Sequence, residues 1–408
     1  MKYIILIADG MADYQIQEIG MKTPMEAARI PNMDYLAKSG MIGMVQTVVD
    51  KLPPGSDVTN LAILGYDPHL YYTGRSPLEA AGMGVTLEPY DVAYRCNFVS
   101  LKNHDGDYDI RRLKPNLIMG DYSAGHISTE EAKELIYEIN DRLGSEVMQF
   151  YPGVSYRHLM VWENGKVKVK TTPPHDILDK KIGAHLPQGD GDELLNELMD
   201  ASIDVLKTNP INEDRIASGK APANCIWLWG QGRAPKMPRF DEKYHLSGSM
   251  ISAVDLIKGL GRYAGFDIIS VPGATGYLDT NYKGKAEYAL SEIRKKDIVY
   301  IHIEAPDEAG HAGDLKAKIK ALEDIDSLVV GTLIDGLRDI EDYRIMVTCD
   351  HRTPVAIRSH TSDPVPFLIY DNKISNKSDQ EFNERNAEGS KIFIDPGYRL
   401  MDFFLGRK

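Results

Sequence analysis

Three apolar, strand-like runs of this chain end in a carboxylate. The runs are Tyr3–Asp9, Ile298–Asp307 and Ile345–Asp350. Buried parallel strands read as continuous apolar runs, and α/β enzymes bind their ligands beyond the carboxyl ends of such strands. The pattern therefore predicts a parallel sheet that delivers three carboxylates to one edge.

Histidines follow the second and third runs closely. Asp307 and His311 are four residues apart, so in a helix their side chains would share one face. Asp350 and His351 are adjacent and would diverge in a strand, so they can converge only in the turn after it. With His360, the set offers three carboxylates and three imidazoles. This is what a pair of divalent ions needs, and it predicts metal-assisted chemistry on an anionic substrate.

Each of these features has a simpler explanation when taken alone. An Asp at a strand end often caps the following helix, a single His is commonly a surface or core residue, and an Asp-x-x-x-His spacing occurs by chance. Their conjunction at three separate strand ends favours the metal site. Mixed Asp and His ligation without thiolates suits Mn²⁺, Zn²⁺ or Co²⁺ better than Ca²⁺.

Ser56 stands just before an apolar helix expected over Val58–Leu64. A serine in this position is commonly an ordinary helix cap. However, a hydroxyl bound to a divalent ion needs no general base, because the ion lowers its pKa. A helix N-terminus would also favour an arriving phosphoryl anion. We therefore predict that Ser56 is the nucleophile.

Composition restricts the partners and the location. The net charge of -13 argues against nucleic acid or an anionic membrane as the main partner, although a local Arg and Lys cluster could still bind a small phosphorylated substrate. Cys96, Cys225 and Cys349 form no paired framework. The N-terminal apolar run is interrupted at Asp9, and no segment approaches the ~18 apolar residues of a membrane span. We expect a cytoplasmic protein with no membrane segment.

The middle of the chain has a different texture from its ends. Helical spacing over Pro24–Gly40, interrupted at Pro31, gives way after about Leu87 to short alternating runs and polar turns. Within that region, Ser128–Leu143 opens with Ser-Thr-Glu-Glu and predicts a capped amphipathic helix. The run Leu159–Val169, with its Asn-Gly pair, predicts a hairpin.

At 408 residues, the chain is longer than one core usually supports. After about residue 238, strands and helices alternate again, which implies a parallel sheet with helices on both faces. We therefore expect the α/β class. One discontinuous domain would comprise residues 1–86 and 236–408, interrupted by a smaller α+β domain over residues 87–235 with flanking linkers.

The combined motifs resemble those of a known family. They are Gly-Ser56-Asp-Val, Asp307-x-x-x-His311, Asp350-His351 and His360-Thr-Ser-Asp-Pro-Val-Pro-Phe367. This set resembles the cofactor-independent phosphoglycerate mutases of the alkaline phosphatase superfamily, in particular their shorter archaeal-type branch. The resemblance covers nearly the whole chain. It implies an alkaline-phosphatase-like core with a mostly parallel sheet between helices, and an inserted substrate-binding domain.

The resemblance also implies a ligand set and a reaction. One metal would be held by Asp9, Ser56, Asp350 and His351, and the other by Asp307, His311 and His360. The expected cofactors are two divalent ions, Mn²⁺ first, with Zn²⁺, Co²⁺ or Mg²⁺ as alternatives. The implied reaction interconverts 3-phosphoglycerate and 2-phosphoglycerate through a phosphoserine on Ser56, with no bisphosphoglycerate primer.

Further residues are implied by weaker matches. His126 corresponds to a His of the inserted domain that shuttles the phosphoryl group or a proton. Arg157 and Arg233 are candidates for binding the substrate carboxylate and phosphate, and Lys258 for the family's active-site lysine. Both arginines could equally be surface residues. Arg75 could bind phosphate or simply stabilise a helix turn.

Two other functions compete with the mutase. A metal-dependent phosphatase, or a mutase for another phosphorylated metabolite, would use the same metals and nucleophile. A homoserine kinase is disfavoured because no Gly-rich nucleotide-binding loop of the usual spacing is present. A non-catalytic, metal-stabilised binding protein is the second rival. The intact Ser56 and the complete ligand set argue against it.

Overall fold

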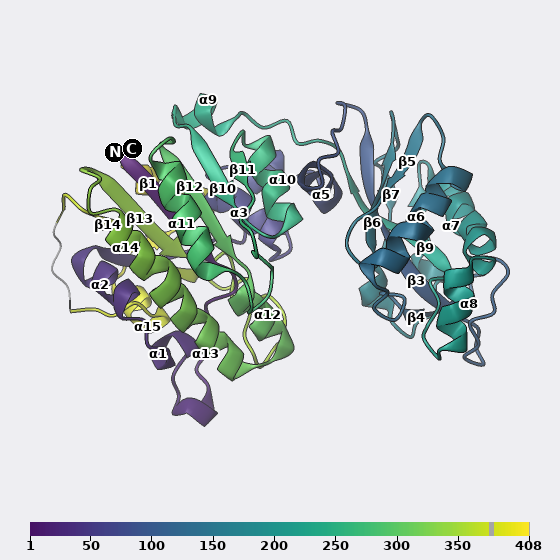
Figure 1. Cartoon of the computed structure of the whole chain (residues 1–408), viewed down its shortest axis with the longest axis horizontal. Coiled ribbons are helices and arrows are strands. Elements are labelled where there is room, and N and C mark those ends of the chain that lie inside the picture. The colour runs from purple at the N-terminus through teal and green to yellow at the C-terminus, as the bar shows by residue number, and fades with distance from the viewer. Residues whose placement is uncertain (375–378, 408) are drawn as a thin grey trace. The chain divides into compact units, whose positions relative to one another are not determined.

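The computed structural model describes residues 1–374 and 379–407, which divide into two compact units (Figure 1). Unit 1 comprises Met1–Tyr72 and the described residues from Lys236 onward, and unit 2 comprises Thr73–Pro235. The chain returns from unit 2 to unit 1 between Pro235 and Lys236, which is the boundary expected from the sequence. It enters unit 2 before the expected 86–87 boundary, because α5 (Arg75–Gly82) packs on β3 (Val92–Lys102) and β9 (Cys225–Gly232).

Unit 1 is built on an eight-stranded sheet in the order β11-β10-β12-β1-β13-β14-β2-β15. The three apolar runs form its central strands, with β1 paired in parallel to both β12 and β13. Strand β14 runs antiparallel to its two neighbours. The expected mostly parallel sheet is therefore confirmed. The strands are β1 (Lys2–Ala8), β2 (Met41–Val45), β10 (Gly248–Ile251), β11 (Asp267–Ile269), β12 (Ile298–Ile303), β13 (Tyr343–Thr348), β14 (Val365–Asp371) and β15 (Phe393–Ile394).

Helices cover both faces of this sheet. Tyr300 of β12 donates a hydrogen bond to Asn60 of α3, whereas Ser249 of β10, in register with Val299, donates to Glu292 of α11. Neighbouring residues of a strand face opposite sides, so α3 and α11 lie on opposite faces. The helices of unit 1 are α1 (Pro24–Ala27), α2 (Pro31–Ser39), α3 (Ser56–Ile63), α4 (Pro68–Tyr71), α9 (Phe240–Tyr244), α10 (Asp255–Tyr263), α11 (Tyr282–Ile293), α12 (Ala305–Ala312), α13 (Leu315–Asp324), α14 (Gly331–Gly336), α15 (Glu384–Gly389) and α16 (Leu400–Leu405).

Unit 2 is an α+β module around a five-stranded antiparallel sheet. Its long strand β3 pairs with β4, β6 and β9, and α7 packs on β9 and on α6. The predicted capping box is confirmed, because the Ser128 hydroxyl accepts from Glu131 N–H while the Glu131 carboxylate accepts from Ser128 N–H. The remaining elements are β4 (Ile118–Asp121), α6 (Thr129–Leu143), β5 (Met148–Tyr151), β6 (Arg157–Trp162), β7 (Val169–Lys170), β8 (Gln188–Gly189), α7 (Asp192–Lys207) and α8 (Pro210–Ala217). None of the helices described here is long and apolar enough to cross a membrane.

The hairpin predicted over Leu159–Val169 is wrong. Asn164 does adopt the left-handed conformation of a turn, with φ of 50°. However, β6 already pairs with β3 on one side and β5 on the other, so no edge is free for the returning chain. The chain leaves the sheet instead, and β7 pairs with β8. A local turn signal was overridden by pairing with strands distant in sequence.

A buried lysine joins the loops that follow β1 and β13. Lys318 of α13 is fully buried, and its ammonium donates to the Asp13 carboxylate at 2.9 Å and to the carbonyl oxygens of Thr353 and Ala12 at 2.8 and 3.4 Å. The same Asp13 oxygen accepts from Val355 N–H at 3.1 Å. One ion pair therefore fixes two loops more than three hundred residues apart in sequence.

We expect Lys318→Met to lower the free energy of unfolding by about 3–5 kcal/mol, because the variant leaves the buried Asp13 carboxylate without its partner. Lys320→Met is the matched control on the same helix: Lys320 is exposed, and its pair with Asp324 contributes at most about 0.5 kcal/mol. Urea denaturation followed by circular dichroism measures both changes. Equal stability of the two variants would contradict the proposed importance of this ion pair.

Candidate metal centre

The predicted metal ligands of unit 1 come from the carboxyl ends of the three central strands. Asp9 follows β1 directly, and Asp307 lies in the first turn of α12, which follows β12. Asp350 and His351 lie in the turn after β13, where adjacent side chains can converge. All four are buried. Because these strands are parallel neighbours, their ends meet at one edge of the sheet.

A first group of ligands surrounds Ser56. His351 Nε2 is 3.1 Å from Ser56 Oγ, 3.4 Å from Asp350 Oδ2 and 3.6 Å from Asp9 Oδ1. Asp9, Asp350 and His351 each offer a ligand atom, and these atoms lie within 4.8 Å of one another. The half-buried Ser56 begins α3. The structure thus brings together the four residues expected to hold one metal.

A second group adjoins the first. The Asp307 carboxylate lies 3.2 Å from His311 Nε2 through one oxygen and 3.5 Å from His360 Nε2 through the other. The two imidazole nitrogens are 2.9 Å apart. The His360 ring stacks on that of His351, with centroids 3.7 Å apart, so the two groups form one continuous cluster.

Polar residues that the sequence analysis missed hold the ligands in place. The Asn60 amide donates to the Ser56 carbonyl oxygen and to Asp350 Oδ2, both at 2.9 Å. The Thr353 hydroxyl donates to Asp307 and lies 3.2 Å from His351 Nδ1. Asn60 lies one helical turn after Ser56, and this spacing was the available signal. Thr353 carried no comparable signal.

The cluster concentrates negative charge away from solvent. Burial and the neighbouring Asp350 raise the pKa of Asp9 well above its usual value. Burial and the charge of Asp307 raise the pKa of Glu304 to about 8. For Asp307 itself, burial opposes ionisation, but hydrogen bonds with His311 and His360 hold its pKa well below the usual range. The bond to Asp307 raises the pKa of His311 to about 9.

Divalent ions fit this donor set. Neither carboxylate oxygen of the buried Asp9 has a hydrogen-bond partner among the described residues. Buried polar atoms in folded proteins are almost always paired, and uncompensated buried carboxylates are costly. Mixed carboxylate and imidazole donors are typical of Mn²⁺ and Zn²⁺ sites. The residues therefore fit a divalent metal ion.

Two further titratable residues of the same region were missed as site residues. His302 and Glu304 lie within the Ile298–Asp307 run, and the Asp9 and His302 side chains are 3.1 Å apart. Their alternation at the end of a buried strand was a usable signal.

Lys258, predicted to bind substrate, lies on α10 and is half-buried. It forms an ion pair with Asp255 at 3.1 Å. Burial, together with the positive charge of Lys258, lowers the pKa of the Lys285 ammonium on α11 to about 8.

The predicted residues of unit 2 do not form a single group. His126 is exposed in the turn between β4 and α6, and it follows two other left-handed residues, Ala124 and Gly125. Arg157 begins β6, with its guanidinium 5.1 Å from the centre of the Tyr156 ring. Arg233 donates to the Gly165 carbonyl oxygen at 3.2 Å.

A more concentrated arginine cluster joins Arg75 and Arg157, both considered from the sequence, to Arg95, which was missed. Arg95 Nε and Arg75 Nε each lie 3.0 Å from a different oxygen of Glu79. Arg95 is buried, and its guanidinium lies 4.4 Å from the centre of the Trp229 ring. The positive charges of Arg95, Arg75 and Arg157 all lower the pKa of the Glu79 carboxyl, against the effect of its burial. Three positive charges are thus gathered around one carboxylate. A single Arg in a strand gives little signal for this in the sequence.

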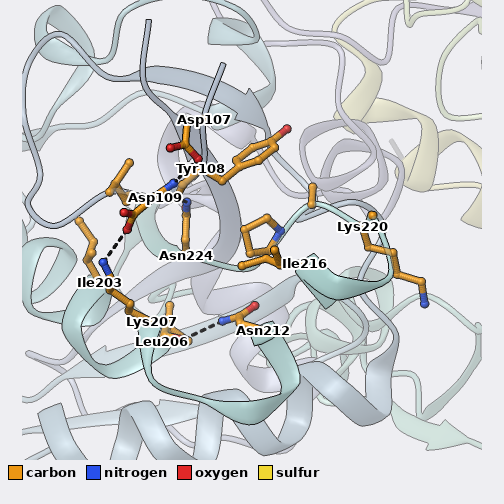
Figure 2. Close-up of a pocket in the computed structure, with 14 residues that line it drawn as sticks. Asp107, Tyr108, Asp109, Ile203, Leu206, Lys207, Asn212, Ile216, Lys220 and Asn224 are labelled. Atoms are coloured by element: carbon orange, nitrogen blue, oxygen red, sulfur yellow. Dashed lines mark hydrogen bonds and ion pairs between the residues drawn. The ribbon is translucent and has the colours of Figure 1, made fainter. Parts of the chain in front are cut away.

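A cavity of unit 2 is lined by none of these residues. It has a volume of about 600 Å³ and lies between α7, α8 and the loop after β3 (Figure 2). Two of its polar side chains have partners: Lys207 pairs with Asp109, and the Asn212 amide donates to the Leu206 and Ala223 carbonyl oxygens. Apolar side chains such as Ile203 and Ile216 form much of the remaining lining. Its charged lining is two lysines balanced by two aspartates, namely Lys207 and Lys220 with Asp107 and Asp109, which does not favour a phosphorylated ligand.

Known proteins resemble this chain over its whole length. It is 51% identical over 408 residues, all of both chains, to a probable 2,3-bisphosphoglycerate-independent phosphoglycerate mutase of Geobacter sulfurreducens. It is 50% identical over 395 residues, 96% of each chain, to a 2,3-bisphosphoglycerate-independent phosphoglycerate mutase of Methanosarcina barkeri. The family model of the same description matches residues 37–212.

Solved structures share the fold. A protein of Pyrococcus horikoshii superposes with a TM-score of 0.83 at 29% identity, covering 99% of this chain and 96% of that one. The cofactor-independent phosphoglycerate mutase of Thermoplasma acidophilum gives a TM-score of 0.66 at 26% identity, covering 100% and 99%. With relatives at about half identity over its full length, the chain belongs to the family of 2,3-bisphosphoglycerate-independent phosphoglycerate mutases.

Proposed function

We propose that this chain interconverts 3-phosphoglycerate and 2-phosphoglycerate through a phosphoserine on Ser56, without a bisphosphoglycerate primer. The observation that supports this most strongly is the convergence of Ser56 with Asp350 and His351 in a chain half-identical to named mutases. The enzyme would be an isomerase that moves a phosphoryl group between two hydroxyls of one molecule.

Two divalent ions are the proposed cofactors, with Mn²⁺ first and Zn²⁺, Co²⁺ or Mg²⁺ as alternatives. Asp9, Ser56, Asp350 and His351 would hold one ion; the residues that would hold the other are Asp307, His311 and His360. When bound, such ions lower the pKa of a coordinated hydroxyl and offset the charge of a phosphoryl group.

Ser56 is the proposed nucleophile in both half-reactions. Its Oγ forms a bond to phosphorus as the bond from phosphorus to the glycerate oxygen breaks, and the serine proton ends on the glycerate oxygen. The second half-reaction reverses these changes with the other glycerate hydroxyl. The Asn60 amide donates hydrogen bonds to the Ser56 carbonyl oxygen and to Asp350, and so holds the nucleophile beside this carboxylate.

Unit 2 is the proposed substrate-binding domain. A glycerate that left between the half-reactions would turn the mutase into a phosphatase, so a second domain that retains it and excludes water has a clear purpose. His126 is the proposed proton or phosphoryl carrier, and its left-handed backbone is the strained kind often found at functional sites. Arg157 and Arg233 of this unit, together with Lys258 of unit 1, remain proposed substrate ligands. The cluster around Glu79 adds Arg95 as another candidate.

The proposed partner is a small phosphorylated carboxylic acid, and the proposed location is the cytoplasm. Supporting the location, Cys96, Cys225 and Cys349 are all buried as free thiols. Free thiols persist where the surroundings are reducing.

We expect Ser56→Ala to lower mutase activity by at least about 10³-fold, because it removes the group that becomes phosphorylated. Conversion of 3-phosphoglycerate with added Mn²⁺ and no bisphosphoglycerate is followed by coupling to enolase. Ser327→Ala is the control, because Ser327 is exposed in the π-helical segment Ile325–Val330 of unit 1. Free phosphate is measured in parallel, and its release without isomerisation would identify a phosphatase instead.

Gly10→Ala should lower mutase activity by at least about 10²-fold, because displaced ligands disrupt the reacting geometry. Gly10 has φ of +61°, and an added Cβ would lie 2.7 Å from Asp307 Oδ1 and 2.8 Å from Asp307 Cα. Gly20→Ala is the matched control, since Gly20 has φ of +74° but nothing within 4 Å of an added Cβ. If both variants lose activity equally, backbone strain rather than crowding of Asp307 is responsible.

Removal of bound metal should abolish mutase activity and lower the melting temperature, because the buried carboxylates then repel one another. Adding Mn²⁺ at 100 times its Kd should raise the free energy of unfolding by about 2.7 kcal/mol per site. Differential scanning calorimetry of the chelator-treated protein measures this. Ca²⁺, which prefers all-oxygen ligands, is the control ion and should stabilise less. Equal stabilisation by both ions would argue against a site that uses the imidazoles.

A further inference from the structure

A buried tyrosine lies directly behind the residue that holds Ser56 in place. Tyr300 belongs to β12 and is fully buried. Strand β12 pairs with β1 on one side and β10 on the other, so the backbone of Tyr300 is fixed within the sheet. Its phenol donates a hydrogen bond to Asn60 Oδ1 of α3 at 2.6 Å. The sheet thus offers a rigid anchor to the helix that begins at Ser56.

The contacts of Asn60 determine which way its side-chain amide points. One end of the amide lies 2.9 Å from the Ser56 carbonyl oxygen and 2.9 Å from Asp350 Oδ2. A carbonyl oxygen and an ionised carboxylate only accept hydrogen bonds, so this end is the NH₂ group. The other end is therefore the amide oxygen, and the Tyr300 hydroxyl must be the donor to it. The phenol favours the one orientation in which Asn60 donates to both partners.

Thr59 does not replace Asn60 in this role. Its hydroxyl lies 3.4 Å from the same Asp350 oxygen, but it also lies 3.0 Å from the Gly55 carbonyl oxygen. A hydroxyl has a single hydrogen to donate, whereas the Asn60 NH₂ group has one for each of its two acceptors. The link between Ser56 and Asp350 therefore depends on the orientation of the Asn60 amide.

We propose that Tyr300 is a positioning residue of the phosphoryl-transfer reaction and acts by orienting the Asn60 amide. That amide in turn holds Ser56 beside Asp350. The inference rests on the proposed function, because it assigns Tyr300 a part in the same reaction. Residues that orient metal ligands through hydrogen bonds commonly change activity by about 10- to 100-fold, since the reacting geometry tolerates little displacement.

The test compares Tyr300→Phe, which removes only the hydroxyl, with Tyr66→Phe in the full-length protein. Tyr66 is the matched control: it is fully buried in unit 1, and its hydroxyl has no hydrogen-bond partner among the described residues. With Mn²⁺ and 3-phosphoglycerate, we expect Tyr300→Phe to lower kcat by about 10- to 100-fold and to change KM by less than about 2-fold. Tyr66→Phe should leave both constants unchanged.

A double substitution tests whether Tyr300 acts through Asn60. Once Asn60→Ala has removed the amide, adding Tyr300→Phe should lower kcat by less than about 2-fold further. A nuclear magnetic resonance measurement on protein with ¹⁵N-labelled asparagine gives a readout that does not depend on activity. The Asn60 side-chain signal is assigned from its loss in Asn60→Ala. Its NH₂ protons should exchange with solvent at least about 10-fold faster in Tyr300→Phe than in Tyr66→Phe.

Equal kcat values in Tyr300→Phe and Tyr66→Phe would overturn the proposal. A loss of kcat as large in the Asn60→Ala background as in the natural chain would also overturn it, because Tyr300 would then act by another route. A lower melting temperature with unchanged kcat would show that the tyrosine is only structural. Circular dichroism confirms that each variant is folded at the assay temperature.

The result is separable from the mutase assignment. If the natural chain does not isomerise 3-phosphoglycerate, the proposed function is overturned, and the exchange of the Asn60 amide alone decides whether Tyr300 orients it. Unchanged amide exchange in an active mutase would overturn the positioning role and leave the proposed function standing.

Discussion

The parallel pairing of β1 between β12 and β13 is the constraint on which the rest of this structure depends. Parallel strands end at the same edge, so Asp9, Asp307 and Asp350 must meet there. Apolar side chains on both faces of these strands stabilise this arrangement, with Ile5, Val299 and Val347 among the buried residues. Packing of the hydrophobic core thus brings three carboxylates together although their negative charges repel one another.

The surrounding protein opposes that repulsion with neutral and positive groups. Asn60 and Thr59 donate to Asp350, and Thr353 donates to Asp307. Farther back, Lys318 and Asp13 tie together the loops that carry the ligands. These contacts preorganise the site, so a bound ion need not rearrange the chain. They also mean that the metal-free protein keeps unfavourable electrostatic energy that ion binding releases.

Much of this could be predicted from the sequence because the signals were local. The continuous apolar runs indicated buried parallel strands, and the residues after them, from Asp9 to His351, lie together as expected. Contacts between distant segments gave no such signal. The hairpin after Leu159 failed because β3 and β5 occupy both edges of β6. The link between Arg95 and Glu79 depends on how α5 packs against β3, which also moved the domain boundary.

The interrupted order of unit 1 also affects how the chain leaves the ribosome. Unit 2 is one continuous segment, Thr73–Pro235, and it is complete before most of unit 1 has been synthesised. Strand β1 is made first, yet both of its partners, β12 and β13, come from the last third of the chain. An apolar strand with two unpaired edges must therefore wait through most of translation. The central strand of the catalytic sheet is thus the segment that most needs protection from aggregation in the newborn protein.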